Sequence, residues 1–299
     1  MTNNNAPPKR ITIPFLIDLV IVSTEEHIRK VEQSEATDRL HVFETSALPW
    51  WVKFYFKATK FHDVERDLWF CPFEPTSNPD YVRRRMYLQE QVDHGYSSED
   101  VQHIAGLLRS DVPDEVLAHA MVQVVNKRFF GEEIPQSMSQ IAGDTLTDVE
   151  QAILPWKYSR GRVAQKSVMD YCEKHLADNV HILDIGHNIG EVVQTTAGAL
   201  RILKENLNQQ VETIFTNHPL TPEVPRIAVK ASTIDGLLRQ PTTPGKTIFI
   251  CKIGKAAAET GNLDFTFGTG EAERACVFKD FFVAFMTDVQ CELKGVPNN

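Results

Sequence analysis

The segment at residues 267–276 has the sequence Phe267-Gly268-Thr269-Gly270-Glu271-Ala272-Glu273-Arg274-Ala275-Cys276. Its two closely spaced glycines allow a tight backbone turn around a flat cofactor, because glycine has no β-carbon. Arg274 lies two residues before the cysteine and can pair with a carboxylate. Cys276 opens an amphipathic helical pattern, and a helix N-terminus favours the thiolate form of cysteine. The segment therefore predicts a loop that presents the thiolate of Cys276 to a flat cofactor.

This segment resembles the cysteine-ligand loop of the cytochrome P450 haem-thiolate family, Phe-x-x-Gly-x-Arg-x-Cys-x-Gly. That family holds its haem iron through a cysteine thiolate. The resemblance implies that Cys276 is the metal ligand of a haem b and that Phe267, Gly270 and Arg274 bind the cofactor. The segment departs from the family by two extra residues before Arg274 and by Phe278, which stands in place of the last glycine. The motif by itself leaves open a buried structural cysteine after a glycine turn.

Further upstream, Gln194-Thr195-Thr196-Ala197 lies inside a helix expected over residues 180–208. It resembles the distal-helix signature of the same family, an acid followed by two threonines. The resemblance assigns Thr195 to the hydroxyl that helps deliver protons to dioxygen. Gln194 replaces the acid, so Glu191, one helical turn earlier, is a second candidate for acid catalysis.

The family's buried ion-pair motif, Glu-x-x-Arg, corresponds to Glu212-Thr213-Ile214-Phe215. Phe215 replaces the arginine, so the ion pair is absent or substituted. Only sixteen positions separate Thr196 from Glu212, which implies that connecting helices of the family fold are missing.

Two more arginines match positions that bind haem propionates in the family. Arg226 lies in a strand expected over residues 226–229, and Arg85 lies in a helix expected over residues 79–93. A guanidinium can contact a carboxylate through two parallel hydrogen bonds. The resemblance therefore makes both arginines candidates for propionate binding.

The pattern over the whole chain is mainly α with a small β region. Helices are expected over residues 24–34, 79–93, 98–109, 113–130, 147–154, 159–176 and 180–208, and again after Cys276. Strands are expected over residues 19–23, 226–229 and 247–251. We expect residues 1–10 to form a disordered polar tail and residues 11–299 to form a single haem domain. The resemblance implies a compact, truncated cytochrome P450-like fold.

Composition limits the class of partner. The chain has 299 residues, 42% of them hydrophobic, and a formal net charge of -9, which gives no general attraction to nucleic acid or to an anionic membrane. The most apolar early stretch, residues 11–22, is shorter than the roughly 20 residues that a membrane span needs. The five cysteines have no CxxC spacing, so they indicate neither a zinc site nor a disulfide scaffold. We expect a cytoplasmic protein without nucleic-acid or membrane partners.

The resemblance implies an oxidoreductase that oxidises or rearranges a small apolar organic substrate with dioxygen or peroxide. A monooxygenase of this type would take electrons from a ferredoxin or reductase. The aromatic-rich residues 46–75 fit either a packed core or the wall of an apolar pocket.

Two alternatives remain open at the level of the sequence. A non-catalytic haem-binding protein is one, because the distal acid, the ion-pair arginine and the last loop glycine are all replaced. The other is an S-adenosylmethionine-dependent methyltransferase. Residues 180–191 resemble the strand, glycine turn and helix that hold that cofactor, and a central parallel sheet of seven strands would support this interpretation.

Overall fold

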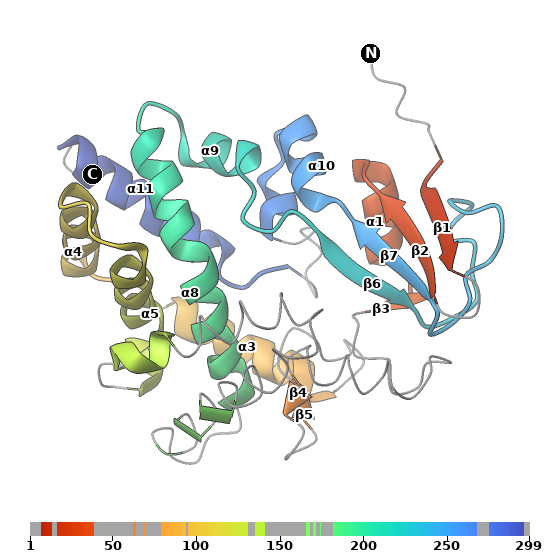
Figure 1. The fold of residues 1–299 in the computed structure, drawn as a ribbon, viewed down its shortest axis with the longest axis horizontal. Coiled ribbons are helices and arrows are strands. Elements are labelled where there is room, and N and C mark those ends of the chain that lie inside the picture. The colour runs from red at the N-terminus through yellow and green to blue at the C-terminus, as the bar shows by residue number, and fades with distance from the viewer. Residues whose placement is uncertain are drawn as a thin grey trace. The chain divides into compact units, whose positions relative to one another are not determined.

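A mixed five-stranded sheet and a group of long helices form the described part of the chain (Figure 1). The computed structural model describes residues 7–13, 17–38, 62–63, 68–69, 79–93, 95–130, 135–140, 166–167, 170–171, 174, 182–267 and 275–295. The chain divides into two compact units, each made of separated segments. The first comprises residues 1–56, 73–82 and 215–276, and the second comprises residues 57–72, 83–214 and 277–299. The single haem domain expected over residues 11–299 stays a prediction.

The first unit is built on the sheet, whose strand order is β1-β2-β7-β6-β3. The strands are β1 Lys9–Ile13, β2 Ile17–Val22, β3 Thr37–Asp38, β6 Val224–Ala228 and β7 Thr247–Cys251. β2 and β7 run parallel, and the other neighbouring pairs run antiparallel. The parallel pair joins segments more than 200 residues apart in sequence, with Asp18 opposite Thr247 and Val22 opposite Cys251.

Two helices complete the core of this unit. They are α1 Glu25–Gln33 and α10 Ile253–Thr260. Thr24 caps α1, since its side chain accepts a hydrogen bond from the His27 N–H. Ile28 of α1 and Phe249 of β7 are fully buried in one apolar cluster together with Phe265.

α10 lies very close to the segment between α9 (Val211–Asn217) and β6, because it carries a glycine at the point of contact. A β-carbon at Gly254 would lie 2.7 Å from Pro219 Cγ and 3.0 Å from Pro222 Cα. The Gly254 N–H also donates to the Pro222 carbonyl at 3.0 Å. A larger side chain here would separate α10 from the segment that follows α9.

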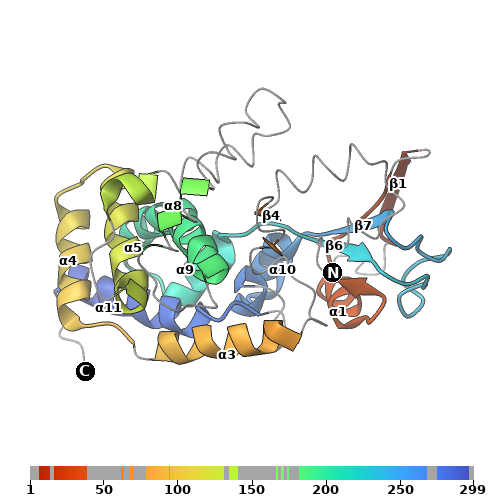
Figure 2. The same ribbon diagram turned by 90° about the horizontal axis from the view of Figure 1, so that it is seen from below.

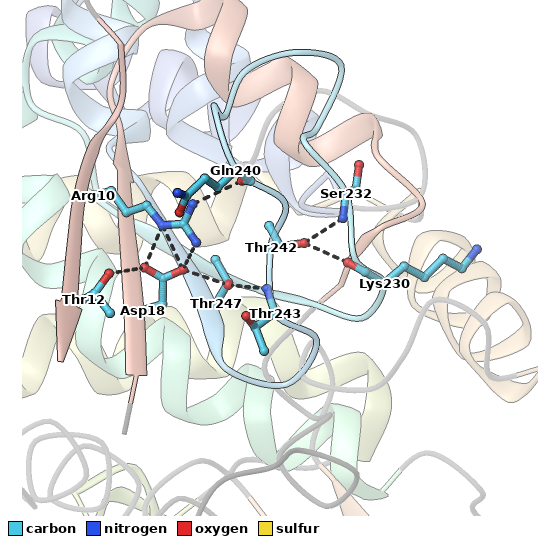
Figure 3. Close-up of polar contacts among 9 residues, drawn as sticks. All are labelled: Arg10, Thr12, Asp18, Lys230, Ser232, Gln240, Thr242, Thr243 and Thr247. Atoms are coloured by element: carbon cyan, nitrogen blue, oxygen red, sulfur yellow. Dashed lines mark hydrogen bonds and ion pairs between the residues drawn. The ribbon is translucent and has the colours of Figure 1, made fainter. Parts of the chain in front are cut away.

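A buried carboxylate holds β1 onto the sheet (Figure 3). Arg10 donates from Nε to Asp18 Oδ1 at 2.9 Å and from Nη2 to Oδ2 at 2.6 Å. The hydroxyls of Thr12 and Thr247 each donate to the same carboxylate at 3.0 Å. Lys9 and Arg10 therefore begin a strand, so the disordered tail predicted over residues 1–10 is wrong at these two residues. The prediction failed because the strand is stabilised by a partner side chain outside the local sequence.

The connection between β6 and β7 is fixed by threonine hydroxyls (Figure 3). Thr242 is buried, donates to the Lys230 carbonyl at 2.8 Å and accepts from the Ser232 N–H at 3.0 Å. Thr247 accepts from the Thr243 N–H at 2.8 Å. These bonds satisfy main-chain groups that no sheet ladder pairs.

The second unit consists mainly of helices. They include α4 Ser98–Arg109, α5 Asp114–Phe130, α8 Ile182–Glu205 and α11 Lys279–Lys294. α5 packs along α8 and α4 packs against α11, as Figure 2 shows. Two short strands, β4 His62–Asp63 and β5 Leu68–Trp69, form a separate antiparallel pair. The helix α3 Pro79–Asp93 belongs to the first unit by its first residues and to the second by the remainder.

Cations of α8 hold the turn between α4 and α5. Arg201 contacts Asp111 at 2.8 Å and Asp114 at 2.9 Å, and it also donates to the Val112 carbonyl. Lys204 donates to the Leu108 carbonyl at 2.8 Å. The last carbonyls of a helix have no partner within the helix, so these contacts stabilise the end of α4.

Tyr96 links the segment before α4 to α11. Its hydroxyl donates to Asp288 at 2.7 Å, and its ring lies edge-on to Phe281 and Phe285. Burial and the neighbouring Asp288 carboxylate raise the pKa of Tyr96 well above its usual value, so the phenol stays protonated.

Most predicted elements agree with the structure. The helices expected over residues 79–93 and 98–109 and the strand over residues 247–251 match α3, α4 and β7 residue for residue. α8 and α9 are joined by residues 206–210 without an intervening helix, as the short spacing implied. The helix expected over residues 147–154 lies outside the described residues. So does most of the helix expected over residues 159–176. No described helix is long and apolar enough to cross a membrane.

The methyltransferase alternative is wrong. It requires a strand in residues 180–185, whereas the backbone is helical from Ile182 onward, inside α8. The larger sheet of the described residues is mixed and has five strands. The isolated motif misled because a glycine-containing apolar run fits the start of a buried helix as well as a strand and turn.

We expect Asp18→Asn to destabilise the protein by about 1–3 kcal/mol, because the amide cannot accept all the bonds that the carboxylate accepts. Burial alone would raise the pKa of Asp18, but hydrogen bonds from Arg10, Thr247 and Thr12 outweigh it and lower the pKa below its usual value. A lowered pKa stabilises the fold above the unfolded-state pKa, about 3.9, and this contribution is lost as the pH falls through the folded-state pKa. Denaturant unfolding from pH 7 to pH 2.5 measures the difference between wild type and variant.

The stability difference should be constant above about pH 5 and shrink below about pH 4. Glu35→Gln is the matched control, because the Glu35 side chain is 92% exposed. A difference for Asp18→Asn that is the same at every pH would contradict the assignment.

Candidate functional site

Cys276 is the exposed cysteine among the three that the structure describes. Cys251 is buried and Cys291 is half-buried, and none of the three forms a disulfide. Cys276 lies three positions before Lys279, the first residue of α11. Its backbone N–H donates to the Phe267 carbonyl at 2.8 Å. This bond holds the main chain of Cys276 next to that of Phe267.

Phe267, which accepts this bond from Cys276, is the last residue of a short 3-10 helix, η3 Leu263–Phe267. The left-handed Gly261 (φ 68°) ends α10, and the Asn262 side chain accepts from the Asp264 N–H at 3.0 Å. Phe265 is fully buried in the core of the first unit, with the Arg29 guanidinium 5.2 Å from its ring centroid. Packing of Phe265 therefore anchors η3 in the core of the first unit.

α9 carries Phe215 at the position where the family resemblance expects an arginine. The Phe215 side chain is fully buried, whereas Glu212 is exposed. The Phe215 carbonyl accepts a hydrogen bond from the Thr266 hydroxyl at 3.0 Å. Apolar packing and one buried hydrogen bond thus occupy the place of the expected ion pair.

Arg226 forms a buried ion pair with Glu32 of α1. Its Nε and Nη2 lie 3.0 and 2.9 Å from Glu32 Oε2, and its Nη1 donates to the Pro225 carbonyl at 2.8 Å. The two side chains are 9% and 0% exposed. The pair fixes α1 against β6, and it directs the guanidinium toward a carboxylate of the protein itself.

The predicted distal residues lie on α8, in the other unit. Thr195 is half-buried, and Thr196 is buried with its hydroxyl bonded to the Val192 carbonyl at 2.6 Å. The backbone of Glu191 and Gln194 is helical, but their side chains lie outside what the structure describes. Glu191 and Thr195 are four residues apart, so they share one face of the helix.

Of the four remaining predicted site residues, the structure describes two. Arg85 lies on α3 and is half-buried. Phe267 ends η3 and is half-buried. Gly270 and Arg274 lie outside the described residues. The structure brings Phe267 and Cys276 together through their main-chain hydrogen bond.

Comparison with known proteins identifies the architecture. No family model and no curated protein matches the chain. Solved structures do match it. P450 RauA, complexed with a biosynthetic intermediate of aurachin RE, has a TM-score of 0.62 at 13% identity, covering 97% of this chain and 86% of its own. A six-coordinated cytochrome P450 from Thermus thermophilus has a TM-score of 0.60 at 12% identity, covering 95% and 86%. Cytochrome P450EX alpha with myristic acid has a TM-score of 0.60 at 10% identity, covering 96% and 83%.

These similarities extend over nearly the whole chain. The chain has the cytochrome P450 fold. The predicted compact, mainly helical P450-like fold with a small β region is therefore confirmed. In the chain, Cys276 follows η3 and precedes α11.

A haem b requires an axial ligand and positively charged partners for its propionates. The exposed thiol of Cys276, held by its backbone next to a helix start, suits the ligand role in a P450 fold. Arg226 suits the propionate role less well, because its Nε and Nη2 already contact Glu32. The described residues therefore fit a haem at the thiolate end.

Sequence reasoning missed two residues of this region, Glu32 and Thr266. Glu32 lies on the same helix face as Ile28 and Val31, and a charge on the apolar face of an amphipathic helix signals a buried ion pair. Thr266 gives no such signal, because its partner is a main-chain carbonyl 51 residues away.

We expect Arg226→Met and Glu32→Leu each to destabilise the protein by about 3–5 kcal/mol, because each leaves a buried charge without its counter-ion. The double variant should cost less than the sum of the two single changes by about 1–3 kcal/mol. Denaturant unfolding of the four proteins measures this coupling. The exposed pair Lys30–Glu26 on the same helix is the control and should show little or no coupling. Strict additivity at Arg226 and Glu32 would refute the buried ion pair.

Proposed function

We propose that this protein is a haem-thiolate enzyme of the cytochrome P450 type, with Cys276 as the axial ligand of a haem b. The observation that carries the proposal is the exposed Cys276 thiol, which lies between η3 and α11 of a P450 fold. Bound through a thiolate, haem supplies the oxidising chemistry of this class. The part that remains for the protein is to bind and orient the cofactor and substrate and to move protons.

Arg274 and Arg85 are the proposed partners of the haem propionates, with Phe267 and Gly270 against the cofactor. Arg226 is a third candidate, and its use requires that the ion pair with Glu32 opens. Charged hydrogen bonds to a propionate contribute about 1.5–3 kcal/mol each. Neutralising Glu32 would therefore favour propionate binding by Arg226.

On the distal side, Thr195, Glu191 and Gln194 are the proposed catalytic residues. Activation of dioxygen consumes two protons, and an amide such as Gln194 has no carboxyl proton to give. Glu191 shares a helix face with Thr195, so its carboxyl group is the proposed proton source and the Thr195 hydroxyl the proposed relay.

The proposed substrate is a small apolar organic molecule that the enzyme oxidises or rearranges. One solved relative by fold binds myristic acid, which supports an apolar class of substrate. A ferredoxin or reductase would supply electrons if the enzyme uses dioxygen, whereas a peroxide would make such a partner unnecessary. Cytoplasmic location remains part of the proposal.

A non-catalytic haem-binding protein is the second candidate function. Phe215 and Glu32 favour it, because the first replaces the ion-pair arginine of catalytic relatives and the second occupies Arg226. Turnover with any oxidant and a metabolised substrate would distinguish the enzyme from this alternative.

Replacing Cys276 tests the ligand assignment. The reduced, carbon monoxide-treated wild type should show the strongly red-shifted band of a thiolate-ligated haem. Cys276→Ala should lose that band, and Cys276→His should give an imidazole-ligated spectrum. Cys291→Ala is the matched control, since Cys291 is half-buried on α11, and it should keep the wild-type band. A thiolate band that survives in Cys276→Ala would refute the assignment.

We expect peroxide or an organic hydroperoxide to support faster turnover than dioxygen with a reductase, because peroxide already carries protons and both electrons. Glu191→Gln should lower dioxygen-driven turnover by about 10²- to 10⁴-fold, the usual contribution of general acid catalysis. Gln194→Ala should have a much smaller effect. Steady-state rates with each oxidant measure both expectations, and efficient reductase-driven turnover by Glu191→Gln would contradict the proton-donor role.

A further inference from the structure

A buried hydroxyl holds the end of η3, close to the residue that bonds the Cys276 main chain. Thr266 is 2% exposed, and its Oγ1 donates to the Phe215 carbonyl at 3.0 Å. The next residue, Phe267, accepts the Cys276 N–H at 2.8 Å. Thr266 is therefore one peptide bond away from the carbonyl that holds the main chain of the cysteine.

The Phe215 carbonyl lies at the end of its own helix, which is why the Thr266 hydroxyl stabilises it. Phe215 lies in the last turn of α9, where helix carbonyls have no partner within the helix. An unsatisfied carbonyl in a buried position would cost free energy, so the hydroxyl and the helix end stabilise each other. This is also the position where the arginine of the expected ion pair is replaced by phenylalanine.

Phe265 and Thr266 hold η3 in different ways. Phe265 anchors it by apolar packing, which is not directional. The hydroxyl bond of Thr266 is directional, so it sets the orientation of the peptide that leads to the Phe267 carbonyl. The direction of that carbonyl in turn determines where the Cys276 N–H, and hence its thiol, can lie.

We propose that Thr266 is a positioning residue for Cys276. Its hydroxyl, bonded to the end of α9, orients the end of η3 and thereby sets the geometry of the thiolate ligand. This contact replaces the missing ion pair through a main-chain acceptor. The inference rests on the proposed function for its spectroscopic consequence, but the link from Thr266 to Cys276 is testable in the haem-free protein.

The first test measures hydrogen exchange of the Cys276 backbone amide in the haem-free protein. Thr266→Val keeps the side-chain volume but removes the donor, so exchange at Cys276 should accelerate by about threefold to tenfold, the equivalent of one net hydrogen bond. Thr266→Ser keeps a hydroxyl and should restore the wild-type rate. Thr242→Val is the matched control, because it removes another buried hydroxyl-to-carbonyl bond in the same unit. Thr266→Ala gives the same test if valine is not tolerated.

Spectra of the haem-loaded proteins are the second test. Thr266→Val should lower the fraction of thiolate-ligated haem in the reduced carbon monoxide complex, while Thr266→Ser and Thr242→Val should keep the wild-type fraction. Equal exchange rates and equal spectra in Thr266→Val and Thr242→Val would overturn the proposal. If wild type shows no thiolate band, the proposed function fails, and exchange at Cys276 alone then decides whether Thr266 positions this residue.

Discussion

The parallel pairing of β2 with β7 is the constraint on which the first unit depends. Each register pair joins residues more than 200 positions apart, and no local preference can supply such a contact. The pairing places Thr247 next to the Asp18 carboxylate, and it aligns the apolar residues of β2 and β7 in one core. β7 is followed almost directly by α10, and α10 by η3. The position of β7 in the sheet therefore constrains where α10 and η3 lie, and η3 precedes Cys276 in the chain.

Among the described residues of this unit, the buried charged side chains Asp18, Glu32 and Arg226 each have a partner that compensates for the loss of water. Asp18 receives donors from an arginine and two threonines, and Glu32 faces the fork of Arg226. Removing one member of such a group costs more than the group contributes as a whole, because the remaining charge stays desolvated. The buried pairs therefore make the arrangement of α1, β2 and β6 specific as well as stable.

Phe215 shows how one residue can contribute to the fold through both its side chain and its main chain. The aromatic side chain fills the core, and the main chain of the same residue accepts the Thr266 hydroxyl. Packing of the Phe215 side chain stabilises α9 against the core, while the single hydrogen bond orients η3 relative to the end of α9. The end of α9 and the end of η3 are thus connected by a hydrogen bond of defined direction.

Local elements and the order of the motifs could be predicted from the sequence alone. Capping residues and apolar periodicity placed α1, α3 and α4, and the motif order along the chain predicted the cytochrome P450 fold. The sequence also predicted Cys276 as the haem ligand, from its position after two closely spaced glycines and before a helix.

The contacts between distant side chains could not be predicted from the sequence and became clear from the folded chain. The fold paired Arg226 with Glu32, Arg10 with Asp18, and Thr266 with the Phe215 carbonyl. It also placed residues 182–191 in a helix rather than in a strand and turn. The physical reason is that propensity and periodicity act within about one or two turns of chain, whereas burial and hydrogen bonding depend on neighbours that the fold brings from distant segments.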